Sequence, residues 1–242
     1  MWHATKLEPI RALISLLYPP ACAVCSAPVG FDDYLCGDCA PKAPKIKPPF
    51  CATCSAPFDG AITETFSCAN CAGRDLHFAA AVAVYRSRGV VRKLIHEFKY
   101  GPRIYLRHPV ADWLIATLDD PRLSGRRFDL VVPVPLHSAR KRERGFNQAE
   151  LLAGLLAAQA GLTLSSALER IRYTTTQTAF DRTERMENLH DAFRLRKKAD
   201  VRGLRVLLID DVMTTGSTLS ECARVLKAGG AVSVHAATAA RA

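Results

Sequence analysis

The sequence predicts an α/β protein with a parallel sheet flanked by helices, preceded by a small N-terminal module of four-cysteine zinc ribbons. Hydrophobic segments of strand length alternate with helix-like segments from residue 128 onward, and this alternation is typical of parallel sheets. Eight of the nine cysteines lie in the first 71 residues, as four Cys-x-x-Cys pairs. The length of 242 residues suits one medium-sized domain and one small domain. We place the small domain at residues 1–75 and the larger domain at residues 76–242.

The N-terminal segment contains one short hydrophobic run at residues 12–18, which Pro19 and Pro20 end. The run is far shorter than the ~20 residues that a membrane-spanning helix needs. No small-residue cleavage site follows it, which argues against a secretory signal peptide. We therefore expect a short amphipathic helix, no insertion into a membrane and a cytoplasmic location.

The cysteine pairs indicate structural zinc. Two residues between cysteines place both sulfurs on one tight turn, and two such turns make a tetrahedral thiolate site. In a cytosolic chain this pattern favours a metal over disulfide bonds. The predicted ligands are Cys22, Cys25, Cys36, Cys39, Cys51, Cys54, Cys68 and Cys71. Sites closed by four cysteines stabilise a fold and perform no chemistry, so we expect two structural zinc ions.

The spacing of the pairs alone leaves open which of them share a zinc. The stretch Cys-Ala-Val-Cys-Ser-Ala-Pro at 22–28 recurs with one change at 51–57, and each copy precedes one further pair. The simplest arrangement is two sequential ribbons, one holding zinc with the four cysteines of 22–39 and one with the four of 51–71. An interleaved or nested arrangement is the alternative. The proline-rich segment 41–50 would be a stiff joint between the ribbons.

The positive charge of the chain belongs to the larger domain. The formal net charge is +10. Residues 1–75 contain six basic and seven acidic residues, a balance of −1, which leaves +11 for residues 76–242. A phosphorylated ligand needs part of this charge, and a nucleic acid is a second partner that it would favour.

The larger domain is predicted to contain four strands and two helices after residue 126. The strands are expected at 128–134, 162–168, 204–210 and 231–237, with a helix at 146–160 and another that follows the turn at 214–218. Prolines at the end of the first segment suit an edge strand or a strand end. The long polar stretch 170–198 has little strand character, and a loop of that length in a compact domain is usually functional.

Residues 206–218 carry the clearest functional signal. Four apolar residues lead into Asp210 and Asp211, and the turn Thr-Thr-Gly-Ser-Thr at 214–218 then begins a helix. Such a turn gathers backbone N–H groups, hydroxyls and the positive end of a helix dipole, which together bind a phosphate. Gly216 lets the backbone approach that phosphate closely. The aspartates would accept hydrogen bonds from sugar hydroxyls, so the predicted ligand is a sugar phosphate.

This segment resembles the signature of type I phosphoribosyltransferases, enzymes that use 5-phosphoribosyl diphosphate. The resemblance implies a type I phosphoribosyltransferase-like parallel sheet in which residues 76–125 form a hood and residues 126–242 the core. It also implies that Asp210 and Asp211 hold the ribose hydroxyls. The residues expected at the 5′-phosphate and ribose beside them are Met213, Thr214, Thr215, Gly216, Ser217 and Thr218.

Further motifs resemble the ComF family of competence proteins. They are Arg-Gly-Phe-Asn-Gln at 144–148 after Pro-Val-Pro-Leu, Lys-Tyr-Gly at 99–101, and a scattered set between 172 and 193. Cysteine pairs before a phosphoribosyltransferase domain complete the architecture, and the resemblance spans nearly the whole chain. It implies a link to DNA uptake, with single-stranded DNA and DNA-uptake proteins as further partners.

The resemblance also assigns roles to residues outside the signature. The loop after the first strand would contact pyrophosphate, through the set Pro135, Leu136, Arg140, Arg142 and Arg144. A flexible loop would close over the site, with the set Arg172, Gln177, Arg182, Arg185 and Asn188. The candidate catalytic residues are Asp210, Asp211 and Arg144, and Mg²⁺ would bind with the substrate. His137 is a candidate proton-transfer group, although a single histidine is more often structural.

Two classes of function remain open from the sequence. One is a phosphoribosyltransferase, a pentosyl-transferring enzyme whose acceptor the hood does not reveal. The other is a non-catalytic protein that binds 5-phosphoribosyl diphosphate and single-stranded DNA as a sensor or scaffold in DNA uptake. Release of pyrophosphate in the presence of a suitable acceptor separates the two.

Overall fold

The computed structural model describes residues 19–60, 66–101, 103–173, 189 and 191–242. The predicted amphipathic helix at 12–18 lies outside these residues. No helix within the described ranges is long and apolar enough to span a bilayer.

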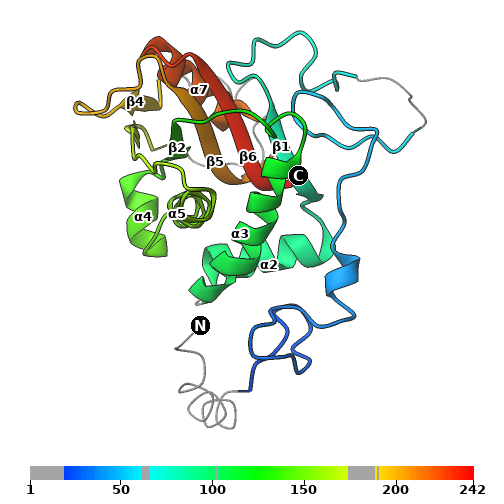
Figure 1. Cartoon of the computed structure of the whole chain (residues 1–242). Helices are drawn as coiled ribbons and strands as arrows, with labels where there is room; N and C mark the ends of the chain where they lie inside the picture. The colour runs from blue at the N-terminus through cyan, green and yellow to red at the C-terminus, as the bar shows by residue number, and fades with distance from the viewer. Residues whose placement is uncertain (1–18, 61–65, 102, 174–188, 190) are drawn as a thin grey trace.

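A four-stranded parallel sheet forms the centre of the molecule (Figure 1). Its strands are β1 (Ala81–Arg86), β2 (Leu130–Pro133), β5 (Arg205–Met213) and β6 (Ser233–Arg241), in the order β1-β6-β5-β2. Every neighbouring pair is parallel. The predicted α/β class is therefore confirmed. Pro133 ends an edge strand, a position where a missing backbone N–H is tolerated.

Helices and short 3₁₀ turns connect and cover these strands. The described helices are α2 (Gly89–Tyr100), α3 (Arg107–Ile115), α4 (Ser138–Arg144), α5 (Gln148–Ala160) and α7 (Ser217–Ala228). The 3₁₀ turns are η1 (Ala40–Lys42), η2 (Ile104–Leu106) and η3 (Ala116–Asp119). The Asn147 side chain accepts a hydrogen bond from Ala149 N and caps α5, a role for which asparagine is well suited.

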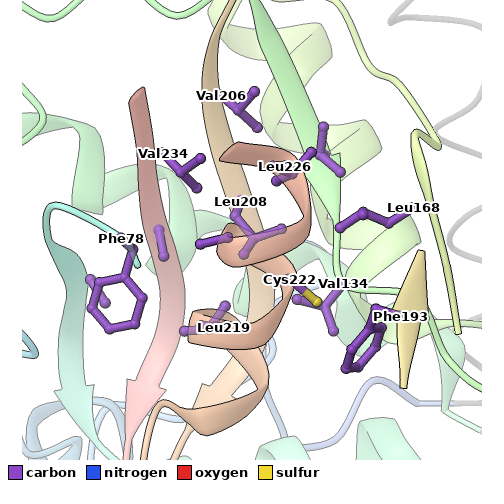
Figure 2. Packing of buried hydrophobic residues seen from close by; sticks show 14 of the residues in the cluster. Phe78, Val134, Leu168, Phe193, Val206, Leu208, Leu219, Cys222, Leu226 and Val234 are labelled. Atoms are coloured by element: carbon purple, nitrogen blue, oxygen red, sulfur yellow. The ribbon is translucent and has the colours of Figure 1, made fainter. Parts of the chain in front are cut away.

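Alternation along the strands sends side chains to two separate cores, because neighbouring residues of a strand point to opposite faces. On β5, Leu207 and Ile209 face the core covered by α2, α3 and α5. Val206 and Leu208 face the other core, which α7 covers. Figure 2 shows this second core, with residues of α7 packed against β5 and β6.

The structure corrects several expectations about the strands. Residues 162–167 form no strand of the central sheet and make one isolated bridge, from Leu164 to Val131. Leu168 begins a separate two-stranded antiparallel sheet, in which β3 (Leu168–Arg170) pairs with β4 (Phe193–Leu195). Strand β1 lies in the segment expected to form the hood, yet it pairs with β6 at one edge of the central sheet.

The two ribbons occupy different places in the fold (Figure 1). The first, residues 19–39, packs beside α2, where Val90 joins its small core. The second, described at residues 50–60 and 66–72, lies against the sheet, and its cysteines share the α7-side core. Ser55 Oγ donates a hydrogen bond to Ala81 O (3.0 Å), which ties this ribbon to β1.

Candidate functional site

The predicted phosphate loop is built as a strand, a tight turn and a helix start. Strand β5 ends at Met213 and α7 begins at Ser217. Gly216 has φ 76° and caps the helix, a left-handed conformation that favours glycine. Thr215 Oγ1 and Ser217 Oγ are 3.0 Å apart, so the loop hydroxyls converge at the N-terminus of α7. That arrangement suits an anion.

The acidic pair lies inside β5 and not at its end, which corrects the predicted strand end at residue 210. Asp210 pairs with Thr238 of β6, and the ladder continues to Met213 opposite Arg241. Consecutive strand residues face opposite sides. Asp211 accordingly faces α2, while the charge of Asp210 acts on Cys222 of α7.

Lys99 is the partner of the buried carboxylate. Its Nζ lies 2.8 Å from Asp211 Oδ2, and both side chains are mostly buried. Burial works against the charge of Lys99, but Asp211 and then Asp210 offset this and raise its pKa above the ordinary value. The lysine comes from the last turn of α2, so it joins the acidic pair to the helix that bears the Lys-Tyr-Gly motif.

Asp210 has an unusual protonation equilibrium for a carboxyl group. Burial and the neighbouring charge of Asp211 raise its pKa to about 7, although Lys99 and a hydrogen bond from Asp211 N act in the opposite direction. A carboxylate that titrates near neutral pH beside a charged partner is typical of a functional site.

A cavity of about 390 Å³ opens next to Lys99. Its lining is Lys99, Tyr100, Gly101, Arg140, Glu143, Arg144 and Tyr173. The cavity therefore combines three cationic side chains with two tyrosine rings, and Lys99 belongs both to it and to the ion pair with Asp211. A polyanionic group adjacent to a sugar would match this combination of charges.

Arg144 is held in a defined position at the cavity. Its Nη2 donates to Tyr100 Oη (3.0 Å) and its Nη1 to Gln148 Oε1 (3.2 Å). The guanidinium also stacks over the Tyr100 ring, 4.7 Å from its centroid. Arg140 similarly lies 5.8 Å from the centre of the Tyr173 ring. These contacts orient the arginines toward one space.

The expected pyrophosphate loop is largely helical, which corrects the prediction of a loop. Residues 138–144 form α4, and Arg140 and Arg144 on it line the cavity whereas Arg142 is exposed and outside the lining. Pro135 and Leu136 lie in the short connection before the helix and are also outside the lining. His137 caps α4 by accepting a hydrogen bond from Ala139 N at Nδ1, a structural role.

Most of the predicted flexible loop lies outside the described residues. Gln177, Arg182, Arg185 and Asn188 are in this group. Arg172 is described and exposed, beside Tyr173, whose ring contacts His137 edge-on at 5.1 Å.

The eight N-terminal cysteines form two clusters of four. In each, the sulfurs lie within 4.8 Å of one another: Cys22, Cys25, Cys36 and Cys39 in the first, and Cys51, Cys54, Cys68 and Cys71 in the second. The geometry is that of two sequential ribbons and not of an interleaved pair. Cys222 is a buried residue of α7, far from both clusters in sequence, and is part of the hydrophobic core.

The donor sets fit zinc. In the second cluster, the hydrogen bond from the Cys54 thiol and the N–H of Cys68 lower the pKa of Cys51 to about 4. The same thiol pair, together with burial, raises the pKa of Cys54. The first thiolate thus forms readily, but a second negative charge beside it is unfavourable without a cation. A divalent metal that binds thiolates, such as zinc, would neutralise these charges.

Three groups of residues at the candidate site were not assigned a role from the sequence. Lys99 and Tyr100 belong to the Lys-Tyr-Gly motif, for which no role was predicted. Tyr173 belongs to no predicted motif. Asn70 and Arg74, which follow cysteines of the second ribbon, contact the phosphate loop. Apart from the Lys-Tyr-Gly motif, no local pattern indicated these positions, because their contacts join distant parts of the chain.

Comparison with known proteins gives two matching domain families. Residues 13–72 match the double zinc ribbon domain, and residues 147–242 match the phosphoribosyl transferase domain. These matches agree with the two four-cysteine clusters and with the parallel sheet that carries the acidic pair.

Individual proteins of similar sequence match different shares of the chain. The chain is 33% identical to the DNA utilization protein YhgH of Salmonella typhimurium, over 91% of this chain and 96% of the relative. It is 32% identical to competence protein F of Haemophilus influenzae, over 66% of this chain and 72% of that protein. Competence protein ComFC of Bacillus subtilis is 39% identical over 45% of this chain and 43% of its own length.

Proposed function

The chain belongs to the ComF family, and from that premise we propose that it binds 5-phosphoribosyl diphosphate with Mg²⁺ and transfers the phosphoribosyl group to an acceptor. Its larger domain is of the phosphoribosyl transferase type, and its relatives are named DNA utilization proteins and competence proteins. The ligand, the metal and the transfer are our proposal, and we expect the reaction to take place in the cytoplasm.

One juxtaposition supports this ligand above others. The acidic pair lies next to the phosphate loop, which begins three residues after Asp211. It also lies next to the arginine-lined cavity, because Lys99 both lines that cavity and pairs with Asp211. A sugar whose hydroxyls meet carboxylates, with a phosphate on one arm and a diphosphate on the other, supplies the complementary groups. A nucleoside monophosphate would leave the cavity arginines without an anion.

The proposed reaction breaks one bond and forms another at the ribose anomeric carbon. The bond from that carbon to the diphosphate oxygen breaks and the diphosphate leaves with the electron pair, while the acceptor nucleophile forms the new bond and loses its proton. Asp210 and Asp211 would orient the ring hydroxyls, and their charge suits a ring that becomes positive. Arg140 and Arg144 would bind the leaving diphosphate. Mg²⁺ would contribute further charge neutralisation on the phosphate oxygens.

Calorimetry with 5-phosphoribosyl diphosphate and Mg²⁺ tests the binding step. Hydrogen bonds to a charged carboxylate contribute about 1.5–3 kcal/mol, so Asp211→Asn should weaken binding roughly tenfold or more. Asp129→Asn is the matched control, because Asp129 forms an ion pair with Arg205 at the opposite end of β5 (2.8 Å). Equal affinity in the wild type and an Asp210→Asn/Asp211→Asn double variant would sink the proposal.

Turnover is a separate question with its own measurement. Pyrophosphate release in a screen of bases, amines and nucleotides would establish transfer and identify the acceptor class.

We also propose that the two clusters bind zinc, so metal analysis of the reduced protein should return about two zinc ions per chain. One zinc per chain, or iron, would overturn that assignment.

A second candidate function rests on the aromatic side chains of the basic domain. Tyr100, Ile104 and Tyr105 are exposed within one stretch that also holds several basic residues. Phe98, in contrast, is fully buried, and Tyr85 packs on Trp113. Exposed rings beside positive charge are the features on which single-stranded nucleic acid stacks. The alternative is therefore a non-catalytic scaffold that holds single-stranded DNA and 5-phosphoribosyl diphosphate together.

A further inference from the structure

The second ribbon makes direct hydrogen bonds to the phosphate loop. Asn70 Nδ2 donates to the carbonyl oxygen of Thr215 (3.0 Å), and Arg74 Nη1 donates to the same oxygen (3.0 Å). Arg74 Nη2 lies 3.2 Å from Ser217 Oγ. Thr215 of the turn and Ser217 at the start of α7 are therefore held by side chains from the ribbon and from the residues directly after it.

The two donors are placed by the cysteines. Asn70 lies between Cys68 and Cys71, two members of the second cluster, so the metal-binding turn determines where it points. Arg74 follows on the same turn, where its N–H bonds to Cys71 O (3.2 Å) and its Nη1 to Asn70 O (3.1 Å). A change in the cysteine cluster must therefore displace both donors.

Holding the Thr215 carbonyl also orients the loop N–H group. In a trans peptide the C=O and the following N–H point in opposite directions. Because the ribbon binds the carbonyl of Thr215, the N–H of Gly216 points away from the ribbon. A phosphate at the start of α7 needs such a free N–H together with the hydroxyls. The guanidinium of Arg74 adds a positive charge next to Ser217.

Packing extends the contact beyond these hydrogen bonds. His77 N donates to Ser220 Oγ in the first turns of α7 (3.2 Å). The ring of Phe78 lies 3.5 Å from the place that a Cβ on Gly216 would occupy. Residues 70–78 thus line one side of the loop and helix start, and they continue directly from the second cysteine cluster (Figure 2 shows Phe78 in this core).

We propose that the second four-cysteine cluster and the phosphate loop are thermodynamically coupled, with Arg74 as the positioning residue between them. Metal in this cluster would hold Asn70 and Arg74, and these would hold the loop in its phosphate-binding conformation. Phosphate binding would in turn strengthen metal retention, because coupling between two sites is reciprocal. This inference rests on the proposed function, since it needs a phosphoribosyl ligand in the loop.

The first cluster supplies an internal comparison. Its described contacts with the body are to α2 and the segment after it: Lys93 Nζ donates to Val24 O, and Arg103 Nη1 donates to Ala23 O. The hydrogen bonds to the phosphate loop come from the second ribbon. Ligand binding should therefore protect one zinc and leave the other unchanged, which a general gain in stability would not produce.

Zinc release from the wild-type protein is the first measurement. The zinc-loaded full chain is mixed with a zinc-selective chelator, and ribose 5-phosphate serves as a probe that carries the 5′-phosphate and needs no Mg²⁺. Allosteric coupling typically changes affinity 5- to 150-fold, so saturating probe should slow release of one zinc by about fivefold or more. A Cys25→Ser variant, which disrupts the first cluster, identifies the protected zinc as that of the second cluster.

Arg74→Gln is the second measurement, with Arg122→Gln as the matched control. Arg122 holds the same ribbon from another side, through Ala52 O (3.0 Å) and Ser55 Oγ (3.0 Å), without contacting the phosphate loop. With zinc saturated, Arg74→Gln should weaken ribose 5-phosphate binding about tenfold and abolish zinc protection. Arg122→Gln should keep both. Arg74→Lys, which retains the charge but not the two-pronged geometry, should fall between.

The outcomes separate this inference from the proposed function. If wild-type protein binds neither ribose 5-phosphate nor 5-phosphoribosyl diphosphate, the proposed function fails and the coupling fails with it. If it binds them, but both zinc ions leave at unchanged rates, only the coupling is overturned. Should Arg74→Gln not fold, as judged by circular dichroism and zinc content, the wild-type release rates decide alone.

Discussion

The ion pair between Lys99 and Asp211 places a lysine where the sugar is proposed to bind. The pair is largely enclosed, with 22% of the Lys99 side chain and 7% of the Asp211 side chain exposed. Removing one partner from such a pair leaves the other charge buried without compensation, which is more costly than removing both. Lys99 therefore stabilises the free site, and a ligand that contacts Asp211 must rearrange or share this contact.

Lys99→Met should lower the free energy of unfolding by about 3 kcal/mol, because it leaves the buried Asp211 carboxylate without a positive partner. Urea denaturation at pH 7 measures the change. Lys141→Met is the control. Lys141 pairs with Glu150, and 51% of the Lys141 side chain and 40% of the Glu150 side chain are exposed. Such an exposed ion pair should contribute less than about 1 kcal/mol. Adding Asp211→Asn to Lys99→Met should recover part of the loss. Equal losses from both lysine variants would contradict this account.

Asp210 makes ligand binding depend on pH near neutrality. Its pKa of about 7 means that the carboxyl group is protonated below that pH and ionised above it. If ribose hydroxyls donate to the ionised form, affinity should rise as pH rises toward 7 and level off above it. Each pH unit below 7 should cost up to about tenfold in affinity.

The phosphates of the ligand also titrate near pH 6, so Asp210→Asn is needed as a reference. Calorimetry between pH 5.5 and 8.5 should show a weaker and flatter dependence in that variant, leaving only the contribution of the ligand. An unchanged profile in Asp210→Asn would assign the titration to another group.

At the scale of single elements, the turn between β5 and α7 depends on Gly216. Its φ of 76° is strained for any residue with a Cβ, at a cost of about 1–2 kcal/mol. Gly161, with φ 65° at the end of α5, would impose the same strain on a residue with a Cβ, and it lies away from the phosphate loop. The two glycines therefore allow loss of stability to be separated from loss of the phosphate site.

Gly216→Ala and Gly161→Ala should lower the melting temperature by similar amounts. Only Gly216→Ala should weaken binding of 5-phosphoribosyl diphosphate, because it changes the direction of the loop N–H groups. Calorimetry and thermal denaturation of the two variants test this. Comparable loss of affinity in both would mean that the effect is one of general stability.

Local sequence patterns predicted the elements whose signal is local. The hydroxyl-rich turn before α7 and the cysteine pairs are short motifs, and both are present as expected. Helix α4 was missed because Ser-Ala-Arg-Lys-Arg-Glu-Arg at 138–144 has no apolar face and begins at an unusual cap, His137. The extension of β5 past Asp210 was missed because it depends on pairing with β6, which a local pattern does not show.

Contacts between segments that are distant in the chain could not be predicted from the sequence. Arg74 and Thr215 are 141 residues apart, and neither position carries a pattern that points to the other. The sequence placed the second ribbon in a small N-terminal domain, at residues 1–75. In the structure its cysteines belong to the core that α7 covers, and its Asn70 side chain donates a hydrogen bond to the phosphate loop.

At the scale of the whole molecule, the charge distribution favours a polyanionic partner larger than a sugar diphosphate. Residues 76–242 hold +11 of the formal charge, while residues 1–75 hold −1. Three cationic side chains of the cavity face the proposed diphosphate. Many of the remaining basic residues lie outside that cavity, and a small ligand does not use them.

Single-stranded DNA is the partner that this surplus and the exposed tyrosines would suit, and fluorescence anisotropy with a labelled oligonucleotide tests it. Binding should weaken with salt by a slope of roughly −0.7 per phosphate neutralised. Tyr100→Ala should reduce affinity about tenfold, because stacking contributes about 1–3 kcal/mol per base. Tyr100→Phe retains the ring and loses only the hydroxyl that Arg144 contacts, so it should bind like the wild type. If the full chain does not bind at low salt, the positive charge serves the phosphorylated small ligand alone and the scaffold function loses its support.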